Sequence, residues 1–286
     1  MKGKIIKIVS NQYTVYSEGK AYDSLAMGKV RLQDKPVVGD EVQFELIDEQ
    51  YCIQKILERK NQMTRPAISN VDQAMIVMSA VEPDFSNVLV DRLIFLISYN
   101  DIEPVIIITK MDLIDESSDI HKYIEDYRKS GYKVICTGFG DELTKLKEVL
   151  KDKVTVLAGQ SGVGKSSLLN RLDKSFSLQT QEISKALGRG KHTTRHTQLY
   201  QVADGWLADT PGFSSLDFSW IDSKVLIGKI KDFKVEEDCR FNDCQHINEP
   251  DCAIKKGVEE GRVSSLRYKN YLDVVPLCNQ RKEWEL

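Results

Sequence analysis

Residues 159–166 carry the clearest chemical pattern in the sequence, Gly-Gln-Ser-Gly-Val-Gly-Lys-Ser. The pattern matches G-x-x-x-x-G-K-S, a loop whose glycines let backbone N–H groups point at phosphate oxygens. It stands between an apolar strand pattern at 154–158 and a helix pattern at 166–172. The helix N-terminus adds its positive dipole, Lys165 can reach the β- and γ-phosphates, and Ser166 can ligate magnesium. The expected phosphate contacts are Gly159, Gln160, Ser161, Gly162, Val163, Gly164, Lys165, Ser166 and Ser167.

A second motif, Asp209-Thr210-Pro211-Gly212, follows a strand pattern at 206–208. Asp209 at a strand end can hold magnesium, and the Gly212 N–H can bond a γ-phosphate and lose that bond on hydrolysis. Between the phosphate loop and Asp209 lies a basic segment, 188–197, at the position of a switch. One of its threonines, Thr193 or Thr194, is expected to complete the magnesium shell. A merely flexible basic loop is the alternative for this segment.

Thr109-Lys110-Met111-Asp112 follows the apolar run 105–108 and resembles the guanine-reading motif Asn-Lys-x-Asp. The aspartate of that motif accepts two hydrogen bonds from guanine N1 and N2, which adenine cannot supply. Threonine replaces the supporting asparagine here, whereas Asp112, the discriminating residue, is kept. Thr137, in Cys136-Thr137-Gly138, is a weaker candidate for a backbone contact with guanine O6.

Four residues near the C-terminus have metal-ligand spacing: Cys239, Cys244, His246 and Cys252. Three thiolates and one imidazole suit a closed, tetrahedral, structural zinc site. The alternative is a set of core cysteines with a surface histidine. In the helix pattern that follows, Arg267, Tyr268, Lys269 and Tyr271 could contact RNA by charge and stacking, or could belong to a packed helix.

The elements that must position these residues follow two patterns. Short alternating or apolar runs at 5–9, 13–16, 42–46 and 52–56 predict a small β-barrel of the OB or SH3-like kind. From residue 71 to about 209, strand patterns alternate with helix patterns, which predicts a mostly parallel sheet with helices on both faces. Ligands of such sheets bind at the carboxyl ends of strands. The polar stretch 60–70 reads as a linker.

Composition limits the classes of partner. The chain has 286 residues, 41% hydrophobic and 29% charged, as in globular proteins, with a net charge of −3 and a pI near 5.9. A protein that binds nucleic acid by bulk charge is usually basic, so RNA contact would need local patches. The longest apolar run, 88–97, is broken by Asp91 and Arg92 and cannot span a membrane. Three of the six cysteines cluster with a histidine, so a reducing cytoplasm with one metal site fits better than a disulfide framework, and no membrane partner is expected.

The order of the motifs is unusual, because the guanine-reading motif precedes the phosphate loop. A β-barrel, a GTPase in this rotated order and a Cys3His segment together resemble the circularly permuted, ribosome-small-subunit-dependent GTPase A family. The resemblance implies an α/β fold: a circularly permuted P-loop GTPase domain with an N-terminal OB-fold and a C-terminal zinc-binding helical domain. The expected bounds of these domains are 1–66, 67–218 and 219–286.

The same resemblance implies a GTPase that assists maturation of the small ribosomal subunit. Its expected cofactors are GTP or GDP, Mg²⁺ and one Zn²⁺, and its expected partners are the small subunit and its rRNA. Hydrolysis is expected to be stimulated by the subunit, and the protein to be a monomer. Phe213 follows Gly212 where many GTPases have a glutamine that orients water, so slow intrinsic turnover is expected. His192 or His196, or a group from the ribosome, would orient the water instead.

Two other classes of function stay open at this point. One is a P-loop ATPase or kinase that acts on a small molecule, against which Asp112 argues. The other is a non-hydrolysing RNA-binding module with a degenerate nucleotide domain, against which the intact Lys165, Ser166 and Asp209 argue.

Overall fold

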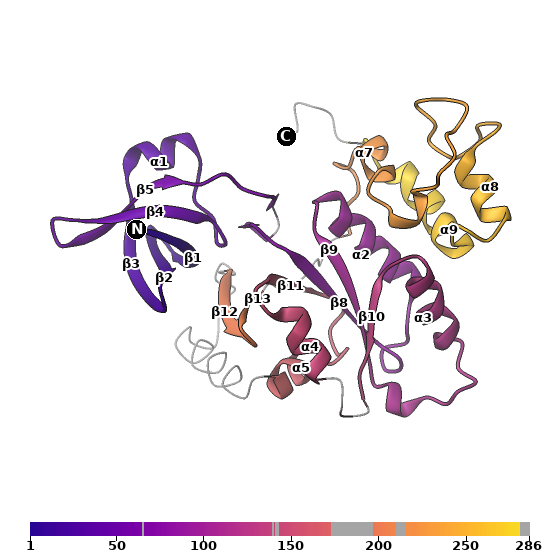
Figure 1. Cartoon of the computed structure of the whole chain (residues 1–286), viewed down its shortest axis with the longest axis horizontal. Coiled ribbons are helices and arrows are strands. Elements are labelled where there is room, and N and C mark those ends of the chain that lie inside the picture. The colour runs from indigo at the N-terminus through magenta and orange to yellow at the C-terminus, as the bar shows by residue number, and fades with distance from the viewer. Residues whose placement is uncertain (65, 139, 141–142, 173–196, 210–215, 281–286) are drawn as a thin grey trace. The chain divides into compact units, whose positions relative to one another are not determined.

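The structure is a computed structural model of the chain, and it describes all residues except 65, 139, 141–142, 173–196, 210–215 and 281–286 (Figure 1). The described residues form two compact units. The first draws on Met1–Ala74, Asp141–Leu157 and Gly164–Phe213, and the second on Met75–Gly140, Ala158–Val163 and Ser214–Leu286.

A closed β-barrel begins the first unit. Its strands are β1 (Lys2–Val9), β2 (Gln12–Ser17), β3 (Lys20–Ala26), β4 (Glu41–Ile47) and β5 (Gln50–Ile56), with helix α1 (Gly28–Gln33) between β3 and β4. The order is β1–β2–β3–β5–β4, and β4 pairs with β1 to close the ring. Only the β3–β5 pair among these is parallel. A closed five-stranded barrel of this kind confirms the OB-fold.

The barrel forms because alternate side chains point inward. Val15, Val42 and Ile53 have no exposed surface and Phe44 only 1%. Strand β3 is not predicted from the sequence, because Lys-Ala-Tyr-Asp-Ser-Leu-Ala shows little apolar periodicity. This strand is held by its register with β2 and β5, which are tertiary contacts.

Buried Asp40 fastens the barrel to the segment that the sequence analysis read as a linker. Its carboxylate accepts hydrogen bonds from Arg59 Nε at 2.7 Å, Ser69 Oγ at 2.6 Å and the Val37 N–H at 2.8 Å. Two short strands, β6 (Gln62–Met63) and β7 (Ile68–Ser69), pair within that segment. The segment is therefore structured at these positions.

The rest of the first unit holds the strands that flank the phosphate loop. They are β11 (Val154–Ala158), β12 (Gln198–Val202) and β13 (Gly205–Asp209), with helices α4 (Leu143–Leu150) and α5 (Lys165–Leu172). Strand β11 runs parallel to β13, and β12 pairs antiparallel with β13. Strand β12 also pairs with β1 of the barrel, so barrel and sheet are continuous within this unit.

The second unit contains parallel strands and their helices. The elements are β8 (Gln73–Ser79), which starts in the first unit, then α2 (Asn87–Tyr99), β9 (Glu103–Thr109), α3 (Ile120–Lys129) and β10 (Lys133–Cys136). The strand order is β8–β9–β10, and every residue of β8 is buried. Such burial explains the continuous apolar runs in the sequence. The expected strand–helix alternation is confirmed.

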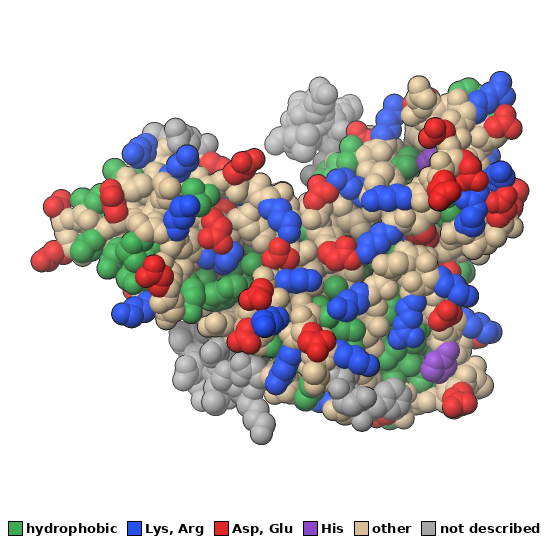
Figure 2. All heavy atoms as spheres, viewed as in Figure 1, with side chains coloured by type: hydrophobic (Ala, Val, Ile, Leu, Met, Phe, Trp, Pro, Cys, Tyr) green, Lys and Arg blue, Asp and Glu red, His purple; other side chains and the backbone are tan. Residues whose placement is uncertain are grey.

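The C-terminal part of this unit is built from short helices. They are α7 (Ser223–Ile227), η2 (Lys231–Phe233), α8 (Ala253–Glu259), α9 (Ser265–Val274) and η3 (Val275–Leu277). Among the described residues, no helix has both the length and the apolar character that crossing a membrane requires. On the face drawn in Figure 2, acidic and basic side chains are interspersed, in keeping with a net charge of −3.

Two of the residues considered for RNA contact are buried in helix α9 and its surroundings. Arg267 and Tyr271 have no exposed surface, so they are core residues. The Arg267 guanidinium bonds Asp91 of α2 at 3.2 Å and Asp232 of η2 at 2.7 Å. It also lies over the Tyr132 ring, 4.8 Å from the centroid. Of the four candidates, Lys269 is exposed and Tyr268 partly so.

Candidate functional site

The guanine-reading motif lies at the carboxyl end of β9. Thr109 is buried, and its hydroxyl donates to the Val163 carbonyl of the phosphate loop at 2.6 Å. The carbonyl of Met78 lies farther away, at 3.2 Å. A hydroxyl has one proton, so the shorter contact is the stronger bond. The structure therefore brings the two motifs together, although the two bonded residues are 54 positions apart in the sequence.

Lys110 takes a left-handed backbone conformation with φ of 60°. Its ammonium donates to the carbonyl oxygens of Val81, at 3.1 Å, and Glu82. These carbonyls lie in the loop after β8, and Lys110 follows β9, so the lysine links the carboxyl ends of these two strands. This contact is not predictable from the sequence, because every residue has a backbone carbonyl and residue types do not show which carbonyl accepts.

Asp112 is exposed on the short helix η1 (Met111–Leu113). The start of this helix is fixed by the Met111 N–H, which donates to the Thr137 carbonyl at 3.0 Å. In turn the Thr137 N–H donates to the Ile108 carbonyl at 2.8 Å. Thr137 therefore lies beside the guanine-reading motif, but its N–H is engaged by Ile108 and is not available for the contact with guanine O6 that the sequence predicts.

The phosphate loop turns sharply at glycines. Gly159 has φ of 134°, and a Cβ there would come within 2.1 Å of the Val77 carbonyl oxygen. Gly164 has φ of 93° and leads into α5, which begins at Lys165. Burial lowers the pKa of Lys165 from its ordinary value. A partly buried, positively charged lysine gains from an anionic ligand, which suits a phosphate site.

The remaining predicted nucleotide residues have fewer described features. Ser166 and Ser167 are exposed in the first turn of α5, and Asp209 is the last residue of β13. His192, Thr193, Thr194, His196 and Gly212 lie outside the described residues.

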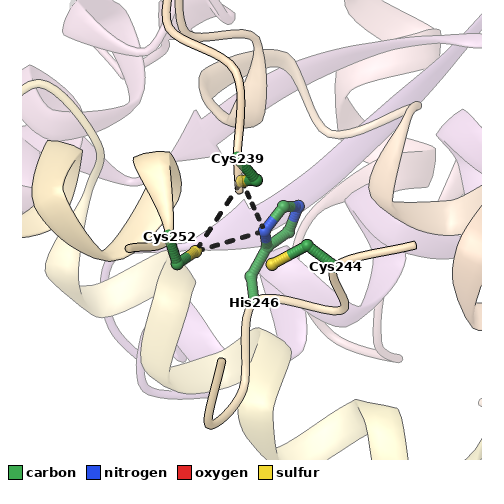
Figure 3. Close-up of side chains that lie close together, drawn as sticks. All are labelled: Cys239, Cys244, His246 and Cys252. Atoms are coloured by element: carbon green, nitrogen blue, oxygen red, sulfur yellow. Dashed lines mark hydrogen bonds between the residues drawn. The ribbon is translucent and has the colours of Figure 1, made fainter. Parts of the chain in front are cut away.

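The predicted metal ligands come together near the C-terminus, with their donor atoms within 4.8 Å of one another (Figure 3). His246 Nδ1 lies 3.3 Å from Cys252 Sγ and 3.6 Å from Cys239 Sγ, and Cys244 points into the same cluster. Burial raises the pKa of the Cys244 thiol to about 12 and lowers that of His246. Without a metal the Cys244 thiol is protonated, so binding of a metal there would release its proton. The donor set fits zinc.

Side chains around the cluster hold its loop in place. Tyr268 and Tyr271 of α9 donate their hydroxyl protons to the carbonyls of His246 and Gln245, each at 2.7 Å. Glu249 accepts from the Gln245 N–H at 2.9 Å and from the Ile247 N–H at 2.7 Å. Sequence reasoning did not find these roles, since it considered the tyrosines as RNA contacts or as part of a packed helix.

Family models match most of the chain. A model described as the RsgA GTPase matches residues 56–219, and one described as the RsgA N-terminal domain matches residues 2–53. The small ribosomal subunit biogenesis GTPase RsgA of a Geobacillus species is 46% identical over 98% of each chain. The protein of that name from Bacillus cereus is 45% identical, again over 98% of each.

Solved structures agree with this fold. One is the crystal structure of YloQ, described as a circularly permuted GTPase, with a TM-score of 0.83 and 39% identity. That match covers 98% of this chain and 96% of the other. YjeQ from Thermotoga maritima matches with a TM-score of 0.84 and 35% identity, covering 98% and 99%.

Proposed function

The chain belongs to the RsgA GTPase family, whose members hydrolyse GTP, and we propose that it binds the small ribosomal subunit and assists its maturation. The observation that carries this proposal is full-length similarity, at 46% identity, to a protein named for biogenesis of that subunit. Binding to the subunit and its rRNA is favoured while GTP is bound, and hydrolysis releases the protein. Gly212 would lose its bond to the γ-phosphate at that step.

The nucleotide site follows from the motifs. Asp112 reads guanine N1 and N2, and the stem of Lys110 lies along the base. The Thr137 N–H already donates to the Ile108 carbonyl at 2.8 Å, so Thr137 supports the neighbouring motif and is not proposed as the donor to O6. Residues 159–167 hold the phosphates, with Lys165 neutralising the β- and γ-phosphates. The hydrogen bond between Thr109 and Val163 supports this arrangement, because it joins the base-reading motif to the phosphate loop.

Two metals belong to the proposal. Ser166 and Asp209 hold Mg²⁺, and Thr193 or Thr194 completes its shell when GTP is bound. The magnesium neutralises charge on the phosphates. A structural zinc is held by Cys239, Cys244, His246 and Cys252, whose donor atoms lie within 4.8 Å of one another.

In the proposed cycle, GTP hydrolysis is slow because the attacking water is poorly oriented. Phe213 has no polar group to hold water, and His192 or His196 takes that role, aided by the ribosomal subunit. We further propose domains at 1–66, 67–218 and 219–286 and a monomeric, cytoplasmic protein.

Steady-state phosphate release tests the function. GTP and ATP are each supplied with and without purified small ribosomal subunits, and Lys165→Ala is the control variant. We expect slow GTP turnover that rises at least about tenfold with subunits, no turnover of ATP, and loss of both GTP rates in the variant.

The other outcomes separate the alternatives. GTP turnover indifferent to subunits would remove the ribosome as the activating partner. Turnover of ATP would overturn the reading of Asp112 and favour a P-loop ATPase or kinase. Subunit binding without turnover of either nucleotide would favour a non-hydrolysing RNA-binding module.

A further inference from the structure

Strand β12 lies between the barrel and the strand that ends at Asp209. On one side Gln198, its first residue, pairs with Lys7 of β1, and on the other side Gln198 pairs with Asp209 of β13. Gln198 also directly follows residues 188–197, the segment expected for switch I. A single backbone position therefore separates the barrel from the proposed magnesium ligand.

The barrel can take β12 as a neighbour because β4 covers only the start of β1. Strand β4 pairs with Lys2–Lys4. At the next residue, the Ile5 N–H donates to the Asp40 carbonyl and the Gly39 N–H donates to the Ile5 carbonyl, each at 2.8 Å. Beyond Ile5 this edge of β1 is open to a further strand, and β12 pairs there with Lys7. Backbone pairing thus extends from the barrel into the strands of the nucleotide domain.

A second contact joins the barrel to β13. The rings of Tyr16, in β2, and Trp206, in β13, meet edge to face, with centroids 4.9 Å apart and planes at 75°. Aromatic pairs in this arrangement stabilise beyond the area that they bury. Trp206 also pairs with Val154 at the start of β11, the strand that precedes the phosphate loop. Tyr16 therefore contacts a residue that belongs to the same pair of strands as Asp209 and the phosphate loop.

The hairpin of β12 and β13 is suited to carry a displacement from one contact to the other. The two strands pair in continuous register from Gln198 with Asp209 to Val202 with Gly205. The two residues of the turn, 203 and 204, have φ of 50° and 60°, as the tight turns of two-residue hairpins require. Leu199 and Leu207 are buried. A fully paired hairpin packed in this way moves as one piece, because close-packed interiors are hardly compressible.

We propose that the barrel responds to the nucleotide through this hairpin. A shift of Asp209 between the GTP-bound and the GDP-bound chain displaces β12 and β13, and with them β1 and β2 of the barrel. Because coupling is reciprocal, whatever binds the barrel in one of its positions changes the relative affinities for GTP and GDP by the same factor. The inference rests on the proposed role of Asp209 in holding magnesium. It adds Gln198 and the contact between Tyr16 and Trp206 as the connection to the barrel.

Hydrogen–deuterium exchange of the full chain, read by mass spectrometry, tests the inference. The chain is saturated in Mg²⁺ with GDP or with a GTP analogue that has a β,γ-imido bridge. We expect residues 159–167 to be protected by both nucleotides. Residues 2–17 are expected to exchange at rates that differ by at least about threefold between the two nucleotides, although they lie outside the nucleotide motifs.

Tyr16→Leu removes the ring and keeps an apolar side chain. We expect it to reduce the difference in exchange within residues 2–17 by at least about half, while residues 159–167 stay protected. It is also expected to change the ratio of the affinities for the GTP analogue and GDP by about 2- to 10-fold, the range that an edge-to-face pair supplies. Isothermal titration calorimetry measures this ratio. Tyr16→Phe keeps the ring and is expected to match the unchanged chain.

Tyr51→Leu is the matched control. Tyr51 lies in the barrel against the rings of Tyr22 and Phe44, with centroids 4.8 and 5.8 Å away. The same substitution therefore disturbs aromatic packing of the barrel without touching the contact between Tyr16 and Trp206. This variant is expected to keep both the difference in exchange and the affinity ratio of the unchanged chain.

Trp206→Leu removes the other ring of the pair and gives a second variant should Tyr16→Leu fail to fold. If the two rings act through their contact, the double variant changes the affinity ratio no more than either single variant does. Additive changes would show that the two residues act separately and would contradict the inference.

The remaining outcomes separate the inference from the proposed function. Protection of residues 159–167 with equal exchange of residues 2–17 in both nucleotide states would overturn the inference and leave the proposed GTPase intact. A difference in barrel exchange that persists in both Tyr16→Leu and Trp206→Leu would overturn the aromatic connection. Absence of protection at residues 159–167 with either nucleotide would contradict the proposed nucleotide site, and this inference with it.

Discussion

At the scale of single residues, the replacement of asparagine by threonine in the guanine-reading motif keeps a structural role. The Thr109 hydroxyl donates to the Val163 carbonyl at 2.6 Å, in a position only 6% exposed. A buried carbonyl that loses its donor costs about 1–3 kcal/mol. The hydroxyl thus helps to hold the phosphate loop against the guanine-reading motif.

Thr109→Val tests this role, since valine keeps the shape of threonine and removes only the hydroxyl. We expect GDP to dissociate about tenfold faster, because the unpaired Val163 carbonyl lets the phosphate loop shift. Release of a fluorescent GDP analogue after mixing with excess GDP measures the rate. Thr109→Ser keeps the hydroxyl and is expected to stay within about twofold of the unchanged chain. Equal rates for the valine and serine variants would show that the hydrogen bond is unimportant.

At the scale of elements, α9 is held to its unit by a buried cation. Although burial alone would lower it, Asp91 and Asp232 raise the pKa of Arg267 above its ordinary value, so the guanidinium is charged. Asp91 also accepts from Asn270 Nδ2 at 2.6 Å. One arginine therefore joins α2, η2 and α9, and the arrangement depends on the presence of all partners.

Arg267→Met keeps most of the buried volume and removes the charge. We expect a loss of about 3–5 kcal/mol in the free energy of unfolding, because Asp91 and Asp232 are left buried without their partner. Urea denaturation followed by circular dichroism measures it. Lys269→Met, on the exposed side of the same helix, is the control and is expected to change stability by less than about 0.5 kcal/mol. Similar losses in both variants would contradict the special role of Arg267.

At the scale of the whole molecule, the rotated motif order joins Asp209 in sequence to the segment that carries the metal cluster. In the usual order, the chain would return from this point into the nucleotide domain. The cluster loop is held to α9 through the hydroxyls of Tyr268 and Tyr271. Loss of the metal is therefore expected to loosen α9 as well as the loop.

Removal of the metal with a strong chelator tests this connection. We expect about one zinc per chain before treatment and, after it, a fall of at least about 5 °C in the thermal midpoint, since a loss near 2 kcal/mol shifts a chain of this size by that much. Limited proteolysis is expected to cut within 236–252 only after treatment. Cys252→Ala should resemble the treated chain, whereas Cys52→Ala should retain the metal. The prediction would be contradicted if the treated chain had the same thermal midpoint and the same resistance to proteolysis as the untreated chain.

Much of the fold was predictable because local patterns along the chain determine it. Apolar runs and alternation predicted most barrel strands and the succession of strands and helices after residue 71, since burial acts on each residue type in the same way everywhere. Motif spacing predicted the order of the nucleotide motifs and the four metal ligands, which lie within a short stretch of chain. The sequence did not mark β3 or β12, whose pairing partners supply what their weak patterns lack.

The sequence alone determined which chemical groups the protein has, and in what order, because residue types and short spacings carry that information. Only the tertiary structure decided which of them meet. It buried Arg267 and Tyr271, which the sequence left open as RNA contacts. It also placed the hydroxyl of Thr109 on the phosphate loop and Gly138 against Asp112. Such contacts join segments far apart in the chain, and their geometry depends on how strands and helices pack.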